Sequence, residues 1–225
     1  LPALRLDAHG RRRIDYRAIV FLALPLVLNA STQAALSLID TWFIGRISTD
    51  ATAAMGASYF LVLVFILLFG GVGMAVQTLV AQAYGSGRKV RAGRAVWTGC
   101  WASLATAPAF IALALASPWL FAPFGLAPGI ERLAEDYWLP RMLGGPLAVA
   151  MWAVTGFFNG IGRTGVTLWL NVFVAVANAI LNEVFMFRLG WGMAGAAWAT
   201  TAAVALGLAA SLAMFLSGAV HREYA

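Results

Sequence analysis

Apolar residues fill long uninterrupted stretches of the chain, and the charged residues fall between them. Six runs contain no charged residue: 18–39, 51–87, 95–130, 142–162, 164–182 and 189–221. Each run reaches the roughly 17 to 25 residues that a helix needs to cross a bilayer, and all are too long for barrel strands. Backbone groups in lipid must also find hydrogen bonds within their own segment. The pattern therefore predicts an all-α, polytopic membrane protein, built as a six-transmembrane-helix bundle.

The charged positions set approximate limits for these helices. The expected spans are 17–45, 52–84, 94–121, 133–160, 164–187 and 193–218. They form one six-helix unit over residues 17–218. A basic tail occupies residues 1–16, and a short end segment occupies residues 219–225.

Small residues recur inside the predicted spans. They include Gly70, Gly71 and Gly73 in the second span, and Gly156 with Gly160 in the fourth. Small side chains let neighbouring helices approach closely in a membrane. We therefore expect close helix packing at these glycines.

Basic residues are distributed unevenly among the links between spans. Those on one side are Arg5, Arg11, Arg12, Arg13 and Arg17 before the first span, and Arg88, Lys89, Arg91 and Arg94 after the second. The alternate links are poorer in bases, and the third contains an acidic cluster at residues 131–136. Basic links stay on the cytoplasmic side. Because six spans return the chain to the side where it began, we expect both termini to be cytoplasmic.

Composition then removes several classes of function. The chain is 62% hydrophobic and 11% charged, whereas soluble domains are about 25% charged. Cys100 is the only cysteine, which excludes an internal disulfide and a thiolate metal site. His9 and His221 lie at the chain ends, which argues against proteolysis by a Ser–His pair inside the membrane. We expect no enzymatic activity, no metal site and no resident cofactor.

Two of the predicted helices carry a polar face. In the first span the spacing is 4, 4 and 3 residues: Asn29, Gln33, Ser37 and Asp40. In the fifth span the spacing is 7 and 4 residues: Asn171, Asn178 and Asn182. These spacings place each set on one side of its helix. Two polar faces in one bundle can line a shared cavity.

Asp40 is the main candidate for chemistry. An ionisable residue inside a span costs roughly 2.5 to 3.5 kcal/mol, so it usually faces the protein interior and marks a transport pathway. Burial disfavours its charged form, so it can accept a proton from one side and release it to the other. The alternative places Asp40 near the membrane surface, hydrated or paired with Arg46. Pro25 in the same helix lacks a backbone N–H and allows a kink, either as a hinge or as a passive bend.

Four stretches carry a resemblance to a known family. They are LALPLVLNASTQAALSLIDTWFIGRI, LVAQAYGSG, GFFNGIGRTGVTLWLNVFVAVANAILN and GMAGAAWATTAA. In this order they resemble the MATE (multidrug and toxic compound extrusion) transporters, most of all the branch that includes the DNA-damage-inducible protein F. The resemblance covers nearly all of residues 15–215. Because the family has twelve helices in two six-helix lobes, the chain resembles the amino-terminal lobe only.

The resemblance implies a coupling site for a cation in this lobe. Asp40 would be its proton-accepting carboxylate, which binds sodium in some members of the family. Asn178, Asn182 and Thr200 would be its hydrogen-bonding neighbours, with Tyr137 at the mouth of helix four. The coupling ion would then be H⁺, or alternatively Na⁺.

Position 182 bears on the choice of ion. Related prokaryotic members often have Asp there, and the Asn182 of this chain leaves Asp40 as a single carboxylate, which favours protons. Glu183 is adjacent, but one residue turns it about 100° around the helix. We expect Glu183 to be a helix-end charge near Arg188 rather than a substitute ligand.

The function implied by the resemblance is secondary active multidrug efflux, in which cationic or amphipathic solutes are exchanged for protons or sodium. The expected partners are the lipid bilayer, a drug-like small molecule, and a second six-helix lobe or a second copy of the chain, without nucleic acid. One alternative is a lipid-linked oligosaccharide flippase of the same superfamily. Its cavity would need several basic residues, whereas Arg and Lys here are confined to ends and links. Another alternative is a non-transporting half-transporter fragment or membrane subunit.

Overall fold

The computed structural model describes residues 4–6, 12–14 and 16–224. Within these ranges, the side chains at 4–6, 12, 13, 18, 21, 22, 25, 26, 29, 30, 33, 219, 221 and 222 are not described. The helices are α1 (Tyr16–Gly45), α2 (Thr49–Gly85), α3 (Lys89–Ala105), α4 (Ala107–Leu115), α5 (Ser117–Phe121), α6 (Pro128–Leu143), α7 (Gly145–Gly160), α8 (Thr164–Asn182), α9 (Gly192–Phe215) and α10 (Gly218–Tyr224), with a 3-10 turn η1 (Ala122–Phe124) and a π-helical turn η2 (Glu183–Arg188). Two short antiparallel strands, β1 (Leu4–Leu6) and β2 (Arg12–Ile14), precede them and were not predicted. The described residues are nearly all helical, which confirms the all-α class.

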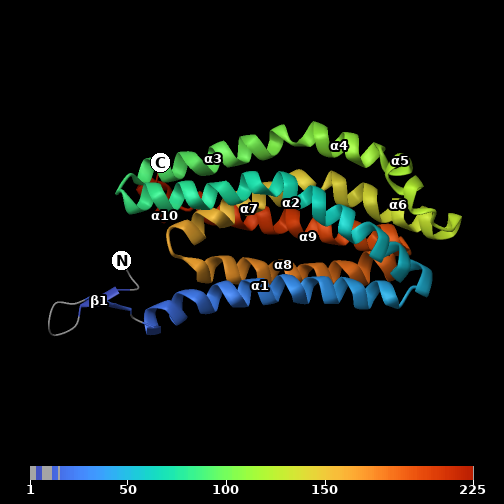
Figure 1. Cartoon of the computed structure of the whole chain (residues 1–225), viewed down its shortest axis with the longest axis horizontal. Coiled ribbons are helices and arrows are strands. Elements are labelled where there is room, and N and C mark those ends of the chain that lie inside the picture. The colour runs from blue at the N-terminus through green and yellow to red at the C-terminus, as the bar shows by residue number, and fades with distance from the viewer. Residues whose placement is uncertain (1–3, 7–11, 15, 225) are drawn as a thin grey trace.

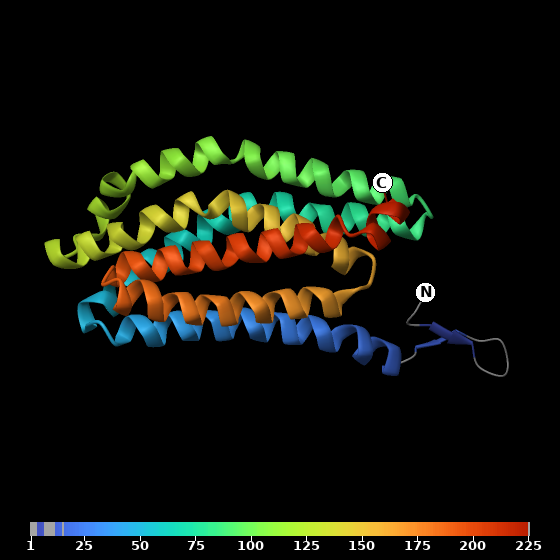
Figure 2. The ribbon, with the colours of Figure 1, turned by 180° about the vertical axis from the view of Figure 1, so that it is seen from behind.

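The long helices run side by side along the longest axis of the molecule (Figure 1). α2 packs on α7, α3 and α6, whereas α9 packs on α8, α6 and α7. α1 lies along α8 at the edge of the bundle, as the reverse view also shows (Figure 2). The start of α1 and the short α10 lie at the same end of the molecule (Figure 1).

The membrane-crossing capacity of the helices follows from length and composition. Among the described residues, four stretches are long and apolar enough: Thr49–Gly85, Lys89–Leu115, Thr164–Arg188 and Gly192–Phe215. α6 and α7 make a fifth if the pair, which is bent by 45°, is one span. Within α1, the described stretch Ala34–Gly45 is apolar but is shorter than a span requires. The chain is a multi-pass membrane protein, although the expected count of six spans is not reproduced one for one.

Prolines explain why two of the expected continuous helices are interrupted. Pro146 lies in the first turn of α7, just after the bend at Gly144. Pro108 likewise lies in the first turn of α4, just after Thr106. Proline has no backbone N–H, and it disfavours helical geometry in the residue before it. The third and fourth apolar stretches therefore break where these prolines occur.

Close approach of α2 and α7 depends on glycine. A Cβ placed on Gly73 would lie 2.7 Å from the carbonyl oxygen of Val149, and one on Gly160 would lie 2.8 Å from a side-chain carbon of Val80. Both distances are below van der Waals contact, so only glycine fits at these two positions. The expectation is wrong for Gly71, around which a Cβ would meet nothing within 4 Å.

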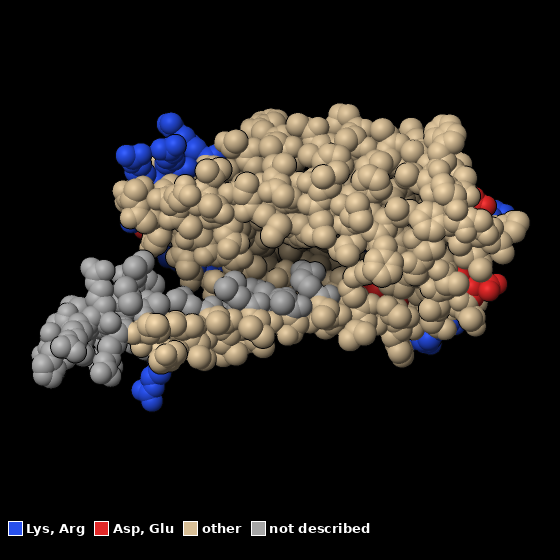
Figure 3. All heavy atoms as spheres, viewed as in Figure 1, with Lys and Arg blue, Asp and Glu red and all other residues tan. Residues whose placement is uncertain are grey.

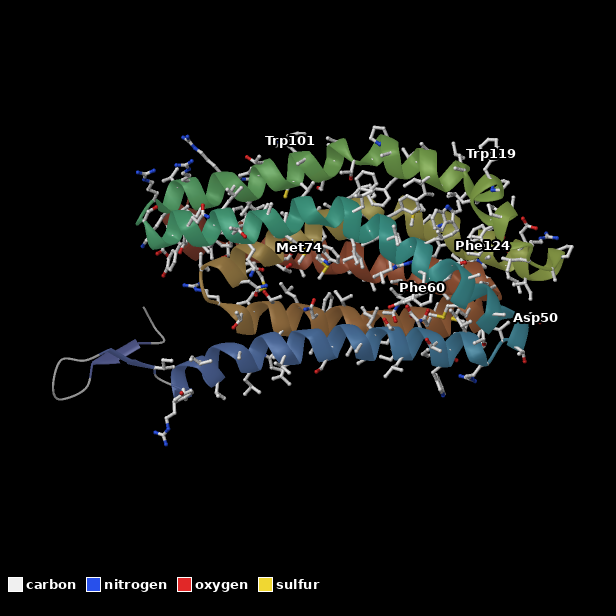
Figure 4. The ribbon with its side chains drawn as sticks, in the orientation of Figure 1. Asp50, Phe60, Met74, Trp101, Trp119 and Phe124 are labelled. Carbon is white, nitrogen blue, oxygen red and sulfur yellow. The ribbon has the colours of Figure 1, made fainter. Side chains whose placement is uncertain are left out.

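The outer surface of the bundle is apolar, as lipid contact requires. Trp138 and Phe157 fill the interior, while Phe60 and Trp119 are 70% and 78% exposed. In Figure 4, Trp119 stands on the outer edge of the bundle, away from the other helices. Aromatic side chains that face outward in such numbers match a lipid environment.

Candidate functional site

Asp40 lies inside the bundle, one turn before the end of α1. The residue is only 4% exposed, and Phe43 and Ile44 in the next turn are buried as well. The side chain faces α8 and α9, whose polar residues contact it. Asp40 is therefore not a hydrated side chain on the protein surface, whereas its depth in the membrane stays a prediction.

Both carboxylate oxygens of Asp40 are held by neutral side chains. Asn182 Nδ2 donates to Oδ1 at 2.8 Å, and Thr200 Oγ1 lies 3.1 Å from Oδ2. The same Asn182 Nδ2 donates to Asn178 Oδ1 at 3.1 Å, and Asn178 Nδ2 donates to Thr200 Oγ1 at 3.1 Å. Asn178, Asn182 and Thr200 are all buried. The structure thus brings together four of the predicted site residues, which lie up to 160 positions apart in the sequence.

The hydroxyl of Thr200 has two possible acceptors but only one proton. Its Oγ1 lies 3.1 Å from the carbonyl oxygen of Ala196 and 3.1 Å from Asp40 Oδ2. When Asp40 is ionised, the Thr200 hydroxyl donates to the carboxylate. When Asp40 is protonated, its own O–H donates to Thr200, which then donates to Ala196. The network accommodates either protonation state by reorienting one hydroxyl.

One acceptor in the network has no partner. Asn182 Oδ1 is buried without a hydrogen bond among the described residues. An unsatisfied buried polar atom costs about 1 to 3 kcal/mol. Because both hydrogens of Asn182 Nδ2 are used by Asp40 and Asn178, rotating the amide would break both of those bonds. The orientation of Asn182 is therefore fixed by its two acceptors.

Tyr137 and Arg141 of α6 complete the surroundings of Asp40. Tyr137 is 3% exposed, so it is buried in the protein rather than placed at an open mouth. Both Arg141 and Tyr137 are near enough to Asp40 to interact with it electrostatically. The Nε atom of Arg141 is buried without a hydrogen-bond partner among the described residues.

Arg141 is the residue that sequence reasoning missed. The expectation that Arg and Lys are confined to ends and links is wrong here, because the guanidinium lines the cavities within the bundle. Its position four residues after Tyr137 was an available signal, since residues four apart share one side of a helix. The nearby bend between α6 and α7 places this charge inside the bundle instead of at an end.

Two adjoining cavities open beside the Asp40 network. One has a volume of about 320 Å³ and is lined by polar residues that include Asn171 and Thr200. The other has a volume of about 440 Å³ and is lined in part by Ser37 of α1. Arg141 and Trp152 line both. Thr200 therefore connects the buried carboxylate to a cavity, and the polar sides of α1 and α8 face adjoining spaces. Figure 3 shows this face of the molecule hollowed between α1 and the rest of the bundle.

Three predicted residues of α1 lie outside the described side chains. They are Asn29 and Gln33 of the polar face and the proposed hinge, Pro25. The backbone of α1 is helical through all three positions. Their roles stay predictions.

Glu183 has a different partner from the one expected. It lies 3.8 Å from Arg46, with both side chains about half exposed, whereas Arg188 was predicted. Arg46 also lies over the rings of Trp42 and Phe187, at 5.1 and 4.8 Å from their centroids. Glu183 is therefore not a ligand of the Asp40 network, and Arg46 is not the counter-ion of Asp40. Among the described residues, no group of three or more His, Cys, Asp or Glu could hold a metal ion.

Comparisons with known proteins give consistent results. A family model described as MatE matches residues 25–184. A probable multidrug resistance protein NorM from Bradyrhizobium diazoefficiens is 31% identical over 184 residues, which are 80% of this chain and 40% of the relative. A probable NorM from Pseudomonas putida is 32% identical over 219 residues, or 92% of this chain and 46% of the relative.

A solved structure shares the fold over a similar extent. It is titled as the outward-facing conformation of a multidrug resistance MATE family transporter of the MOP superfamily. The TM-score is 0.79 at 25% identity, over 91% of this chain and 45% of that chain. The chain thus spans less than half the length of these relatives and of this structure.

Proposed function

Because the chain belongs to the MATE family, we propose that it forms the amino-terminal lobe of a secondary active multidrug exporter in a bacterial inner membrane. The lobe takes part in transport rather than catalysis, and it exchanges cationic or amphipathic solutes for protons. A second six-helix lobe or a second copy of the chain completes the transporter. Both termini are cytoplasmic. The concentration of basic residues at the end where α2 meets α3, and of acids at the opposite end, supports this orientation (Figure 3).

The observation that carries the proposal is the buried Asp40 with its neutral partners. A carboxylate 4% exposed, bonded to Asn182 and Thr200 at 2.8 and 3.1 Å, has no ion-pair partner within 4.0 Å among the described residues. Hydrogen bonds from neutral donors compensate a buried charge only in part. Asp40 is therefore suited to gain and lose a proton during a cycle.

The energy available to one such group is sufficient. One pH unit supplies about 1.4 kcal/mol per proton, and 100 mV across the bilayer supplies about 2.3 kcal/mol per charge. Together these are about 3.7 kcal/mol, which sustains a solute gradient of roughly several hundredfold at one proton per neutral solute. For a monovalent cation the exchange moves no net charge, so only the pH term remains and sustains a gradient of roughly tenfold. A single carboxylate can thus support active extrusion.

Protonation of Asp40 would change how α1 is held. A hydrogen bond to an ionised group contributes about 1.5 to 3 kcal/mol, and one between neutral groups about 0.5 to 1.5 kcal/mol. Asp40 is bonded to both α8 and α9, so neutralising it loosens α1 by on the order of 1 to 3 kcal/mol in total. This is the usual size of an allosteric coupling energy. We infer that α1 then moves about Pro25 and releases the solute.

Protons are favoured over sodium by the ligand set. Sodium requires several oxygen ligands, and Asp40 is the only carboxylate in the network. One of its neighbours, Asn182, turns its amide nitrogen and not its oxygen to the carboxylate. A sodium-driven cycle would show dependence of transport on external sodium at constant pH.

The flippase alternative gains little support. A lipid-linked pyrophosphate would require several basic groups, and Arg141 is the only charged side chain among the described residues that line the two cavities. A non-transporting subunit is the remaining alternative. Cross-linking and mass determination of the purified chain in detergent test whether it forms a stable pair.

The direct test is Asp40→Asn in the complete transporter, reconstituted with its second lobe or second copy in proteoliposomes loaded with a fluorescent cationic dye. Asn has the shape of protonated Asp, so the variant should fold while losing efflux driven by a pH gradient. Asp50→Asn is a matched control, because Asp50 is exposed in the first turn of α2, and it should keep efflux. Wild-type efflux by Asp40→Asn would refute the mechanism.

A further inference from the structure

A second feature of the molecule is a basic cavity at the end where α2 meets α3. It has a volume of about 470 Å³, and three arginines line it: Arg88, Arg91 and Arg94. Gln82 and the apolar side chain of Leu79 come from α2. None of the described residues that line the cavity is acidic. The site therefore presents three positive charges to whatever occupies it.

No carboxylate of the described residues neutralises these arginines. Among the described residues, none of the three has a carboxylate within 4.0 Å, and all three are exposed. Lys89, in the same segment, differs because its Nζ lies 2.6 Å from Glu223 Oε1 of α10. The three cavity arginines thus keep their charge available for an external anion.

Arginine is well suited to bind a phosphate group. Its planar guanidinium presents paired N–H donors that match phosphate oxygens, and several such groups can contact one phosphate. The cavity also lies at the amino-terminal end of α3, where the helix dipole favours an anion. The hydroxyls of Ser86 and Thr98 already donate to backbone carbonyls. Among the described side chains that line the cavity, the donors that remain for an anion are the guanidinium groups and the Gln82 amide.

The surroundings of the cavity are those of a membrane interface. Leu79 and Ala95 give it an apolar side along the helices. Farther along α3, Trp97 and Trp101 are 45% and 68% exposed, and Trp101 points away from the bundle (Figure 4). Tryptophan is enriched where membrane proteins meet lipid headgroups. A free anion would have no use for this apolar side, whereas a lipid would place its acyl chains along it.

We propose that this cavity binds the phosphate headgroup of an anionic phospholipid, with its acyl chains lying along α2 and α3. Basic pockets between helices on the cytoplasmic side are suited to such headgroups. A zwitterionic choline lipid is disfavoured, because its ammonium group would lie beside three arginines. The proposal does not depend on the transport mechanism, so each can fail separately.

The test is native mass spectrometry of the purified full chain, released from mixed micelles with defined lipids. We expect retained adducts of phosphatidylglycerol and few of phosphatidylcholine. One basic side chain near an anionic lipid surface strengthens attraction by about fivefold. The variant carrying Arg88→Gln, Arg91→Gln and Arg94→Gln should therefore bind phosphatidylglycerol about 100-fold more weakly.

A matched control is Arg163→Gln. Arg163 is exposed, and it is not among the residues that line the cavity. It belongs to the link between α7 and α8, and this link lies at the same end of the molecule as the link between α2 and α3 (Figure 1). The Arg163→Gln variant should bind phosphatidylglycerol as the unchanged chain does. Three results would overturn the proposal. They are a loss of phosphatidylglycerol binding in Arg163→Gln as large as in the triple variant, as many phosphatidylcholine as phosphatidylglycerol adducts on the unchanged chain, and undiminished phosphatidylglycerol binding by the triple variant.

Two further measurements distinguish a bound lipid from a bound free phosphate and control for misfolding of the triple variant. Inorganic phosphate added at the concentration of the lipid should leave the adducts in place, and its displacement of the lipid would assign the cavity to a free phosphate instead. The single variant Arg91→Gln should bind about fivefold more weakly. It should also elute from a sizing column with the unchanged chain, so that a lipid effect in a well-folded protein is measured even if the triple variant aggregates.

Discussion

Replacing Thr200 by Val tests whether Asp40 is ionised while it is bonded to α9. Val has nearly the shape of Thr, so the substitution removes the hydroxyl and little else. The hydroxyl lies 3.1 Å from Asp40 Oδ2 and accepts from Asn178 at 3.1 Å. Without it, a buried carboxylate oxygen and a buried amide hydrogen both lose a partner.

The magnitude depends on the charge of Asp40. The bond to an ionised carboxylate contributes about 1.5 to 3 kcal/mol, and the bond to a neutral carboxyl group about 0.5 to 1.5 kcal/mol. Thr200→Val should therefore destabilise the protein by about 1 kcal/mol more in alkaline than in acidic buffer. For a chain of this length, that corresponds to an extra fall in Tm of about 2 to 4 °C. The sign follows because the ionised form, which loses more, is present at higher pH.

The assay is thermal unfolding of the chain in lipid nanodiscs, compared between acidic and alkaline buffers. Thr201→Val is the matched control on the neighbouring residue, whose Oγ1 donates to the carbonyl oxygen of Pro140 at 2.9 Å. That bond joins two neutral groups, so its loss should lower Tm equally in both buffers. If Thr200→Val also lowers Tm equally in both, Asp40 does not change charge over this range and the coupling mechanism is refuted.

Three other substitutions test separate features. Asn182→Asp adds a second carboxylate beside Asp40. Two adjacent carboxylates cannot easily both ionise unless a cation lies between them, so Na⁺ should raise the Tm of the variant and not that of the unchanged chain. An equal rise in both proteins would contradict this. Gly73→Ala should lower the free energy of unfolding by about 1 to 3 kcal/mol, because its Cβ would lie 2.7 Å from a carbonyl oxygen of α7; Gly71→Ala, with open space, should not, and equal effects would refute the packing argument. The hydrogen bond from Lys89 lowers the pKa of Glu223, so the bond stabilises α10 above the ordinary pKa of a Glu side chain and is lost as pH falls through the lowered value. The protection factors of the α10 amides, which are exchange rates corrected for the pH dependence of free amides, should fall on acidification, and in Glu223→Gln they should no longer change with pH over this range.

The sequence alone was sufficient to predict long apolar helices and the polar side chains that surround Asp40. Long uncharged runs in a chain that must satisfy its backbone in lipid leave the helix as the only choice, and such helices form. The spacing of Asn178 and Asn182 predicted a polar side of one helix, and the structure places both beside Asp40. Local periodicity can be read from a sequence because it depends only on helix geometry.

The tertiary structure decided which polar groups meet. Arg46 was expected as an alternative partner of Asp40, but it lies beside Glu183. Arg141, which no prediction singled out, lines the cavities of the bundle. Each outcome depends on how far a helix is rotated and where it bends, which no residue encodes by itself. Asp40 and Thr200 are 160 positions apart, and only the packing of α1 against α8 and α9 makes them neighbours. Helix formation is local, whereas the pairing of charges is a property of the whole bundle.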